Sequence, residues 1–167
     1  MWALVENEEI SRIYTRPTAL TIGDTQYPSN VMEKWSNGEL ETIGIYAVVE
    51  DNTNLKDEIY YNNGLQSFVF ENDTVTKRFG VASAKDLDQL KSLRKTRINS
   101  RASTMLATYD WYTIRAASGG TAVPAAITTY QTAVRLRSNE HATTIDAVST
   151  VDELAALTYA WPDDPVV

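Results

Sequence analysis

The period of the hydrophobic pattern changes near residue 80, and this change constrains the fold most. Before it, short apolar segments alternate with polar residues, as in strands whose side chains point to opposite faces of a sheet. After it, apolar residues recur at steps of three, four and seven, as on one helix face. We therefore predict the α+β class, with a strand-rich domain at residues 1–82 and a helical domain at 83–167. A chain of 167 residues can form two such small modules, each marginal alone.

The first 50 residues predict short strands and one helical turn. The polar stretch from Glu6 to Glu9 predicts a turn in an opening hairpin. Gly23-Asp24 indicates a strand pair or an ordered loop. We expect one helical turn at 31–35, a cap after it at 36–40, and a buried strand at 43–49.

Residues 58–79 predict two more hairpin turns. Asn62-Asn63-Gly64 is one candidate, because Asn and Gly tolerate positive φ. Glu71-Asn72-Asp73 is the other, between strands at 66–70 and 75–79. The preceding stretch 51–62 has some likeness to a calcium loop, but it lacks the sharp-turn Gly and the bidentate Glu, so we expect a solvated loop.

The second half predicts an antiparallel helix pair and two short helices. Ser83 is the expected N-cap of a long helix, and Pro124 is expected to open its partner helix. Thr108 to Asp110 predicts a cap for a short helix that Gly119-Gly120 ends. Thr150 and Glu153 predict a capping box for the last helix. The expected apolar stripes of the two long helices are Leu87, Leu90, Ile98, Ala102 and Met105, and Ile127, Tyr130, Val134, His141, Ile145 and Val148.

Composition and charge weigh against several functional classes. The net charge is −7 and the isoelectric point is near 4.7, which argues against a nucleic-acid partner or an anionic membrane surface. Cysteine is absent, which excludes disulfides, thiolate nucleophiles and cysteine-rich zinc sites. The start of the chain has no signal-peptide pattern, and no apolar stretch approaches 18 residues. We therefore expect a chain made in the cytosol that spans no membrane.

The residues that usually perform catalysis are few or scattered. His141 is the only histidine, and its place on an apolar stripe predicts helix packing. The carboxylates occupy no apolar context that would raise a pKa towards that of a general acid. The glycine pairs match neither a phosphate loop nor a dinucleotide fingerprint. We predict no enzyme activity, no cofactor, no metal and no small-molecule substrate.

A basic run and many aromatic residues leave several interpretations open. The run from Lys91 to Arg101 is compatible with a solvated helix face, with an acidic protein partner, or with nucleic acid. The four tryptophans and nine tyrosines should mostly lie in the core. In a chain with little core per module, some of them are expected at an interface, where Trp, Tyr and Arg concentrate binding energy.

Several longer motifs follow one another in a characteristic order. The first half contains WALVENEEISRIYTRPTALTIGDTQYPSN, a tryptophan and LETIGIYAVV. The second half contains LKSLRKTRINSRASTMLATYDWYTIRAAS, the Gly-Gly break, AVPAAITTYQTAVRLR and LAALTYAWPDD. In this order they resemble the tail fibre assembly chaperones of tailed bacteriophages, the first set being similar to the amino-terminal domains of that family and the second to its helical region. The most recognisable residues are Thr108, Asp110-Trp111, Pro124, Tyr130, Arg135 and Trp161-Pro162. The front departs from the commonest variant, so a different fibre or virion component stays open as the partner.

The resemblance implies a protein that helps a trimeric fibre to fold or assemble, in the host cytoplasm, and that stays on the fibre tip in some members. It implies a phage tail fibre protein as partner, bound near its carboxy-terminal end, with no catalysis. The predicted partner-binding residues are Arg94, Arg97, Arg101, Asp110, Trp111, Tyr112, Tyr130, Arg135 and Trp161. Two alternatives remain: a structural virion component without chaperone activity, and a receptor- or sugar-binding module with aromatic residues near the 51–56 loop.

Overall fold

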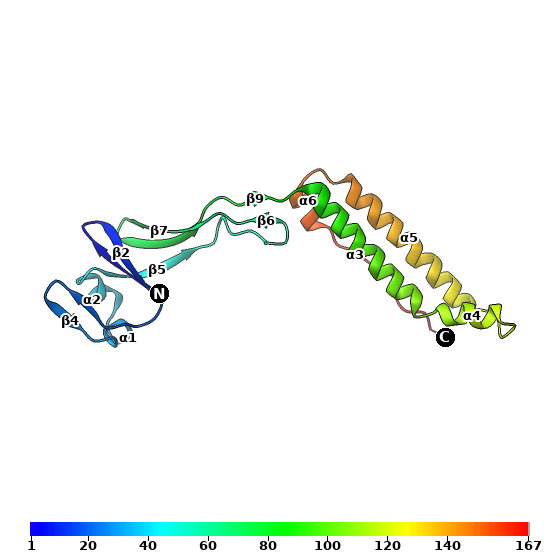
Figure 1. Ribbon diagram of the computed structural model, residues 1–167, viewed down its shortest axis with the longest axis horizontal. Coiled ribbons are helices and arrows are strands. Elements are labelled where there is room, and N and C mark those ends of the chain that lie inside the picture. Colours follow the sequence, from blue (N-terminus) through cyan, green and yellow to red (C-terminus); the bar gives the residue numbers. More distant parts are fainter. Residues whose placement is uncertain (167) are drawn as a thin grey trace. The chain divides into compact units, whose positions relative to one another are not determined.

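A computed structural model describes residues 1–166 and has the predicted α+β class, with a strand-rich first part and a helical second part (Figure 1). The chain divides into two compact units, Met1–Ser83 and the part from Ala84 onward. The sequence pattern placed the boundary one residue earlier, between residues 82 and 83.

The first unit is built on a five-stranded sheet in the order β2-β1-β5-β8-β7. Its strands are β1 (Trp2–Glu6), β2 (Glu9–Tyr14), β5 (Ile45–Asp51), β7 (Gln66–Glu71) and β8 (Thr74–Phe79). The pairing of β5 with β8 is parallel, and the other neighbours are antiparallel. The two edge strands, β2 and β7, contact each other, so the sheet is curled.

Two predicted hairpins are confirmed, and each has a two-residue turn with positive φ. Asn7 and Glu8 have φ of 53° and 64° between the paired residues Glu6 and Glu9. Asn72 and Asp73 have φ of 50° and 55° at the other hairpin, which joins β7 to β8. Turns with two positive φ values match the right-handed twist of the flanking strands.

A small pair of strands and two short helices complete the first core. The predicted pair at Gly23 is present as β3 (Leu20–Ile22) and β4 (Thr25–Tyr27). The predicted helical turn is α1 (Val31–Lys34). The stretch predicted as its cap is a second helix, α2 (Asn37–Glu41), since Ser36 and Glu39 form a capping box. The buried cluster of this core is Leu4, Tyr14, Leu20, Val31, Met32, Leu40 and Ile45.

The hairpin predicted at Asn62-Asn63-Gly64 is wrong. β6 (Tyr61–Asn62) pairs with β9 (Ser83–Ala84) and not with the strand that follows it. The Asn63 side chain bonds the backbone N–H and C=O of Lys56, each at 2.9 Å. Position 64 requires a glycine because the backbone packs closely there: a Cβ would lie 2.6 Å from the carbonyl carbon of Gly80.

The second unit contains α3 (Leu87–Ala107), α4 (Asp110–Ala117), α5 (Ala125–Ala147) and α6 (Val151–Ala156). The predicted N-cap of α3 is wrong: Asp86 accepts from the Gln89 N–H at 2.8 Å, while Ser83 belongs to β9. The expected side-chain cap of α4 is absent, and Pro124 stands one position before α5. The predicted capping box of Thr150 and Glu153 is confirmed at α6.

The core of the second unit lies between α3 and α5, which run side by side in opposite directions (Figure 1). Of the predicted stripes, the side chains that are buried are Leu90, Ile98, Ala102, Ile127, Tyr130, Val134 and Ile145. His141 and Val148 are half-buried. No helix within residues 1–166 has the length and apolar character needed to cross a membrane.

Candidate functional site

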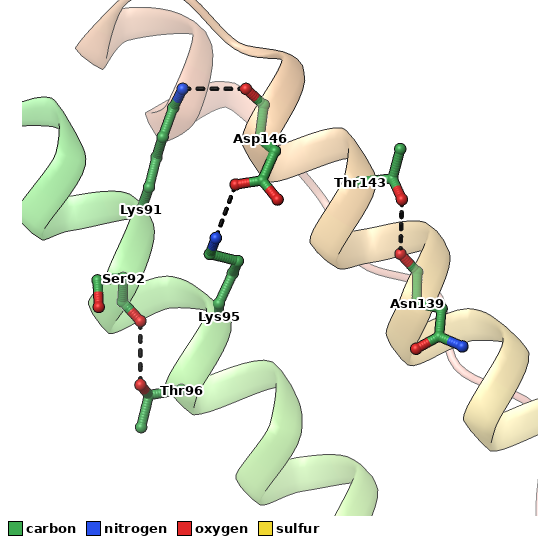
Figure 2. Close-up of polar contacts among 7 residues, drawn as sticks. All are labelled: Lys91, Ser92, Lys95, Thr96, Asn139, Thr143 and Asp146. Carbon is green, nitrogen blue, oxygen red and sulfur yellow. Dashed lines mark hydrogen bonds and ion pairs between the residues drawn. The ribbon is translucent and has the colours of Figure 1, made fainter.

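Lysines of the basic run help to hold α5 against α3. Lys95 Nζ lies 2.7 Å from a carboxylate oxygen of Asp146, and Lys91 Nζ donates to the Asp146 carbonyl at 3.1 Å (Figure 2). Asp146 lies in the last turn of α5, whose carbonyls have no partner within the helix. These two cations therefore stabilise a helix end of their own chain, at the surface of the helix pair.

The segment after α6 lies along one face of the helix pair and is held mainly by aromatic contacts. Trp161 packs against the cluster of Ala102, Tyr130 and Val134. The guanidinium carbon of Arg101 is 5.5 Å from the centre of the Trp161 ring, within the range of a cation–π contact. Arg94 has the same relation to Tyr159, at 5.2 Å.

His141 lies between two rings of this segment. The ring centres of Tyr159 and Trp161 are 5.0 and 5.1 Å from that of His141, both in edge-to-face geometry. His141 Nε2 is 3.0 Å from the carbonyl oxygen of Ala160. The structure therefore places this histidine in a packing role, which agrees with the interpretation drawn from its apolar stripe.

Asp164 fastens the end of the segment. The Tyr130 hydroxyl donates to Asp164 Oδ1 at 3.2 Å. Burial raises the pKa of Tyr130 to about 12, and the hydrogen bond to Asp164 and its negative charge add to the shift. The pKa of Tyr109 is raised by the same causes. The rings of Tyr109 and Tyr130 are in edge-to-face contact at 5.3 Å.

The opposite face of the helix pair carries an open groove of about 520 Å³. Its lining residues are Asn99, Ala102, Ser103, Leu106, Ala107, Asp110, Arg135, Ser138 and Asn139. Arg101 and Met105 line a different hollow, beside the carboxy-terminal segment. Two neighbouring positions of a helix point about 100° apart, so residues 99 and 101 lie on nearly opposite sides of α3.

One hydrogen bond crosses the floor of this groove. The buried Ser138 donates its hydroxyl to Asn99 Oδ1 at 3.3 Å, which joins α5 to α3. The Asn99 Nδ2 group then remains available as a donor. No hydrogen bond or ion pair joins the side chain of Asp110 or Arg135 to another residue of the described chain.

Helix α4 displays a cluster of aromatic rings and one cation. The rings of Trp111 and Tyr112 are 3.8 Å apart between centres. The guanidinium carbon of Arg115 lies 4.9 Å from the centre of the first ring and 5.1 Å from that of the second. Trp111 is 50% exposed and Ile114 is 66% exposed, and α4 contains no buried side chain.

The nine predicted partner-binding residues fall into separate groups. Asp110 and Arg135 line the groove together. Trp111 and Tyr112 follow Asp110 directly on α4 and do not line the groove. Arg94, Arg101, Tyr130 and Trp161 belong to the face that the chain's own carboxy-terminal segment occupies. Tyr130 is only 5% exposed there. Arg97 is exposed and has no polar or ring contact with the rest of residues 1–166.

Sequence reasoning missed the amides of the groove and the partners of the carboxy-terminal segment. Asn99 and Asn139 lie on the polar side of their helices, where a pattern based on apolar residues has no signal for them. Asp164 lies between Asp163 and Pro165 in an acidic tail, a sequence that is typical of a solvated segment. The alternation of Tyr159 and Trp161 could have indicated that the tail covers an apolar surface.

The described residues contain no group of three or more His, Asp and Glu side chains that could hold a metal ion. No family model, no curated protein and no solved structure matches this chain.

Proposed function

We propose that this chain is a tail fibre assembly chaperone of a tailed bacteriophage, without enzyme activity or cofactor. It binds the carboxy-terminal end of a trimeric fibre protein in the host cytoplasm and promotes its folding or trimerisation. It can remain on the fibre tip in the virion. Nucleic acid, membrane and small-molecule substrates have no part in this proposal.

The observation that carries the proposal is the gathering of Asp110 and Arg135 at one open groove. These residues belong to the motifs through which the chain resembles the chaperone family, and they lie 25 positions apart in the sequence. Neither side chain makes a hydrogen bond or an ion pair within residues 1–166. Exposed Trp111 follows Asp110 directly, and exposed aromatic side chains concentrate binding energy at interfaces.

A fibre subunit has a physical need for such a partner. Intertwined strands form through contacts that are distant in sequence, which makes folding slow. Until the trimer closes, unpaired strand edges stay exposed and can pair with the wrong chain. A protein that covers one end of the subunit lowers the concentration of those free edges and leaves the correct pairing as the main outcome.

Co-expression tests the proposal. The tail fibre subunit of the same phage is produced with and without this chain, and the soluble trimer is quantified by size-exclusion chromatography with light scattering. We expect most of the trimer to be lost without this chain. A fibre that is equally soluble and trimeric in both cases contradicts the chaperone role.

Mass spectrometry of purified particles separates the chaperone from a purely structural component. A structural tip protein or adaptor is present at a fixed ratio to the fibre and has no effect on trimer yield. A transient chaperone raises the trimer yield and is absent from particles. A chaperone that stays on the tip raises the trimer yield and is also present in particles.

A further inference from the structure

We infer that the groove between α3 and α5 binds an extended segment of the partner through main-chain hydrogen bonds. This inference rests on the proposed function and names the part of the fibre subunit that is recognised: an unpaired strand or strand end, rather than a folded surface. The groove residues then form the primary contact with the fibre subunit. The aromatic face that the carboxy-terminal segment covers does not.

The chemistry of the groove walls supports a main-chain ligand. Asn99 comes from α3 and Asn139 from α5, so each wall presents a side-chain amide. An amide side chain can donate and accept in the same way as a peptide group. The hydroxyls of Ser103 and Ser138 add further polar positions, whereas Ala102 and Ala107 leave space for a backbone to approach.

The length of the groove suits a short extended segment. Asn99 and Ala107 are eight residues apart on α3, or about 12 Å at 1.5 Å per residue. An extended chain covers that distance in about four residues. Asp110 and Arg135 place opposite charges at the same site, which favours a segment carrying one basic and one acidic side chain.

The other face of the same helix pair already holds an extended segment. After α6 the chain leaves helical geometry and lies along α3 and α5, where Trp161 and Asp164 contact it. That face selects aromatic rings, whereas the groove offers amides and hydroxyls. The two faces therefore offer different chemistry to an extended chain, and the chain's own carboxy-terminal segment already occupies one of them.

The test measures affinity for the purified fibre subunit with matched variants of the full chain. The groove variant is Asn99→Ala with Asn139→Ala. The control is Ser100→Ala with Leu136→Ala, on the same helices but outside the groove lining. We expect the dissociation constant to rise about tenfold or more for the groove variant and less than twofold for the control. Thermal unfolding monitors the fold, and Asn139→Asp, which replaces the NH2 donor group by a charged carboxylate oxygen at nearly constant size, serves if the double variant is unstable.

Photocrosslinking gives a second readout. A benzophenone amino acid at position 139 should crosslink to one short stretch of the fibre subunit, and the same group at position 136 should not. Equal affinity of the groove and control variants, or crosslinks at 136 alone, overturns the inference and leaves the chaperone proposal standing. A wild-type chain that does not bind the fibre at all overturns both.

Discussion

The hydroxyl of Tyr130 donates a hydrogen bond of 3.2 Å to the carboxylate of Asp164 and so joins the middle of α5 to the carboxy-terminal segment. The two residues are 34 positions apart in the sequence. The buried Tyr159 hydroxyl and Trp161 Nε1 have no hydrogen-bond partner in the described structure. Asp164 is therefore a side-chain anchor of this segment, which is held as well by ring contacts and by the Ala160 carbonyl beside His141 Nε2.

Removing this anchor should destabilise the second unit. Asp164→Asn weakens a hydrogen bond to a charged acceptor, and we expect a loss of about 1–2 kcal/mol in the free energy of unfolding. Asp163→Asn is the matched control, because the Asp163 carboxylate makes no hydrogen bond or ion pair within residues 1–166, and this substitution should change stability by less than about 0.5 kcal/mol. Urea unfolding followed by tryptophan fluorescence measures both. Equal effects of the two substitutions would show that Asp164 is not an anchor.

Alkaline pH should weaken the fold through Tyr130. The pKa of this tyrosine is about 12 in the folded chain, against an ordinary value of 10.0. A raised pKa contributes stability that is complete below pH 10 and lost as the pH rises towards 12. The free energy of unfolding should therefore fall with pH in this window, and less steeply for Tyr130→Phe. Urea unfolding at pH 9 to 12 and constant ionic strength is the measurement. Identical slopes would contradict the assignment.

The contribution of the α6 capping box to stability should be measurable by itself. The Glu153 N–H donates to the Thr150 hydroxyl at 3.1 Å, and α6 buries Val151 and Leu154. Thr150→Ala should cost about 1 kcal/mol of stability, as loss of an N-cap does. Ser149→Ala removes a neighbouring hydroxyl that caps nothing, so its unfolding midpoint in urea should match the wild type. A midpoint shift for Ser149→Ala as large as that for Thr150→Ala would count against the capping role.

Substitution of two glycines of the first unit by alanine should have opposite effects on stability. Gly44 has φ of +79°, and a Cβ there would lie 2.8 Å from the Val5 carbonyl oxygen. Gly44→Ala should therefore destabilise the unit by about 1–3 kcal/mol. Gly38 lies in α2 with open space around it, so Gly38→Ala should be neutral or stabilise by up to about 1 kcal/mol. Thermal unfolding of both variants gives the sign, and a stabilised Gly44→Ala would refute the close contact.

The α3–α5 core should show the usual cost of a cavity. Ile127 is completely buried, and Ile127→Ala should lower the free energy of unfolding by about 2–5 kcal/mol. Ile114 is 66% exposed on α4, so Ile114→Ala should change it by less than about 0.5 kcal/mol. Chemical denaturation compares the two. A large effect at Ile114 would mean that α4 is covered in solution.

Local sequence was sufficient for much of the fold. The hairpins at Asn7-Glu8 and Asn72-Asp73, the capping box at Thr150 and the stripes of the long helices all depend on residues within a few positions of each other. Their periods and turn types are set by backbone sterics and by side-chain hydrogen bonds to nearby amides. The same local reasoning erred at Ser83 and Gly64, where Asp86 was the better cap and a neighbouring strand decided the conformation.

The candidate site could be predicted only in part. The resemblance singled out Asp110 and Arg135, but nothing in the sequence showed that they line one groove with Asn99 and Asn139. It also could not separate Arg101 and Trp161, which pair with each other, from residues available to a partner. These relations depend on how α3, α5 and the carboxy-terminal segment pack together. The sequence alone thus determined the elements and their apolar faces, whereas the tertiary structure decided which polar side chains the core uses and which it leaves open.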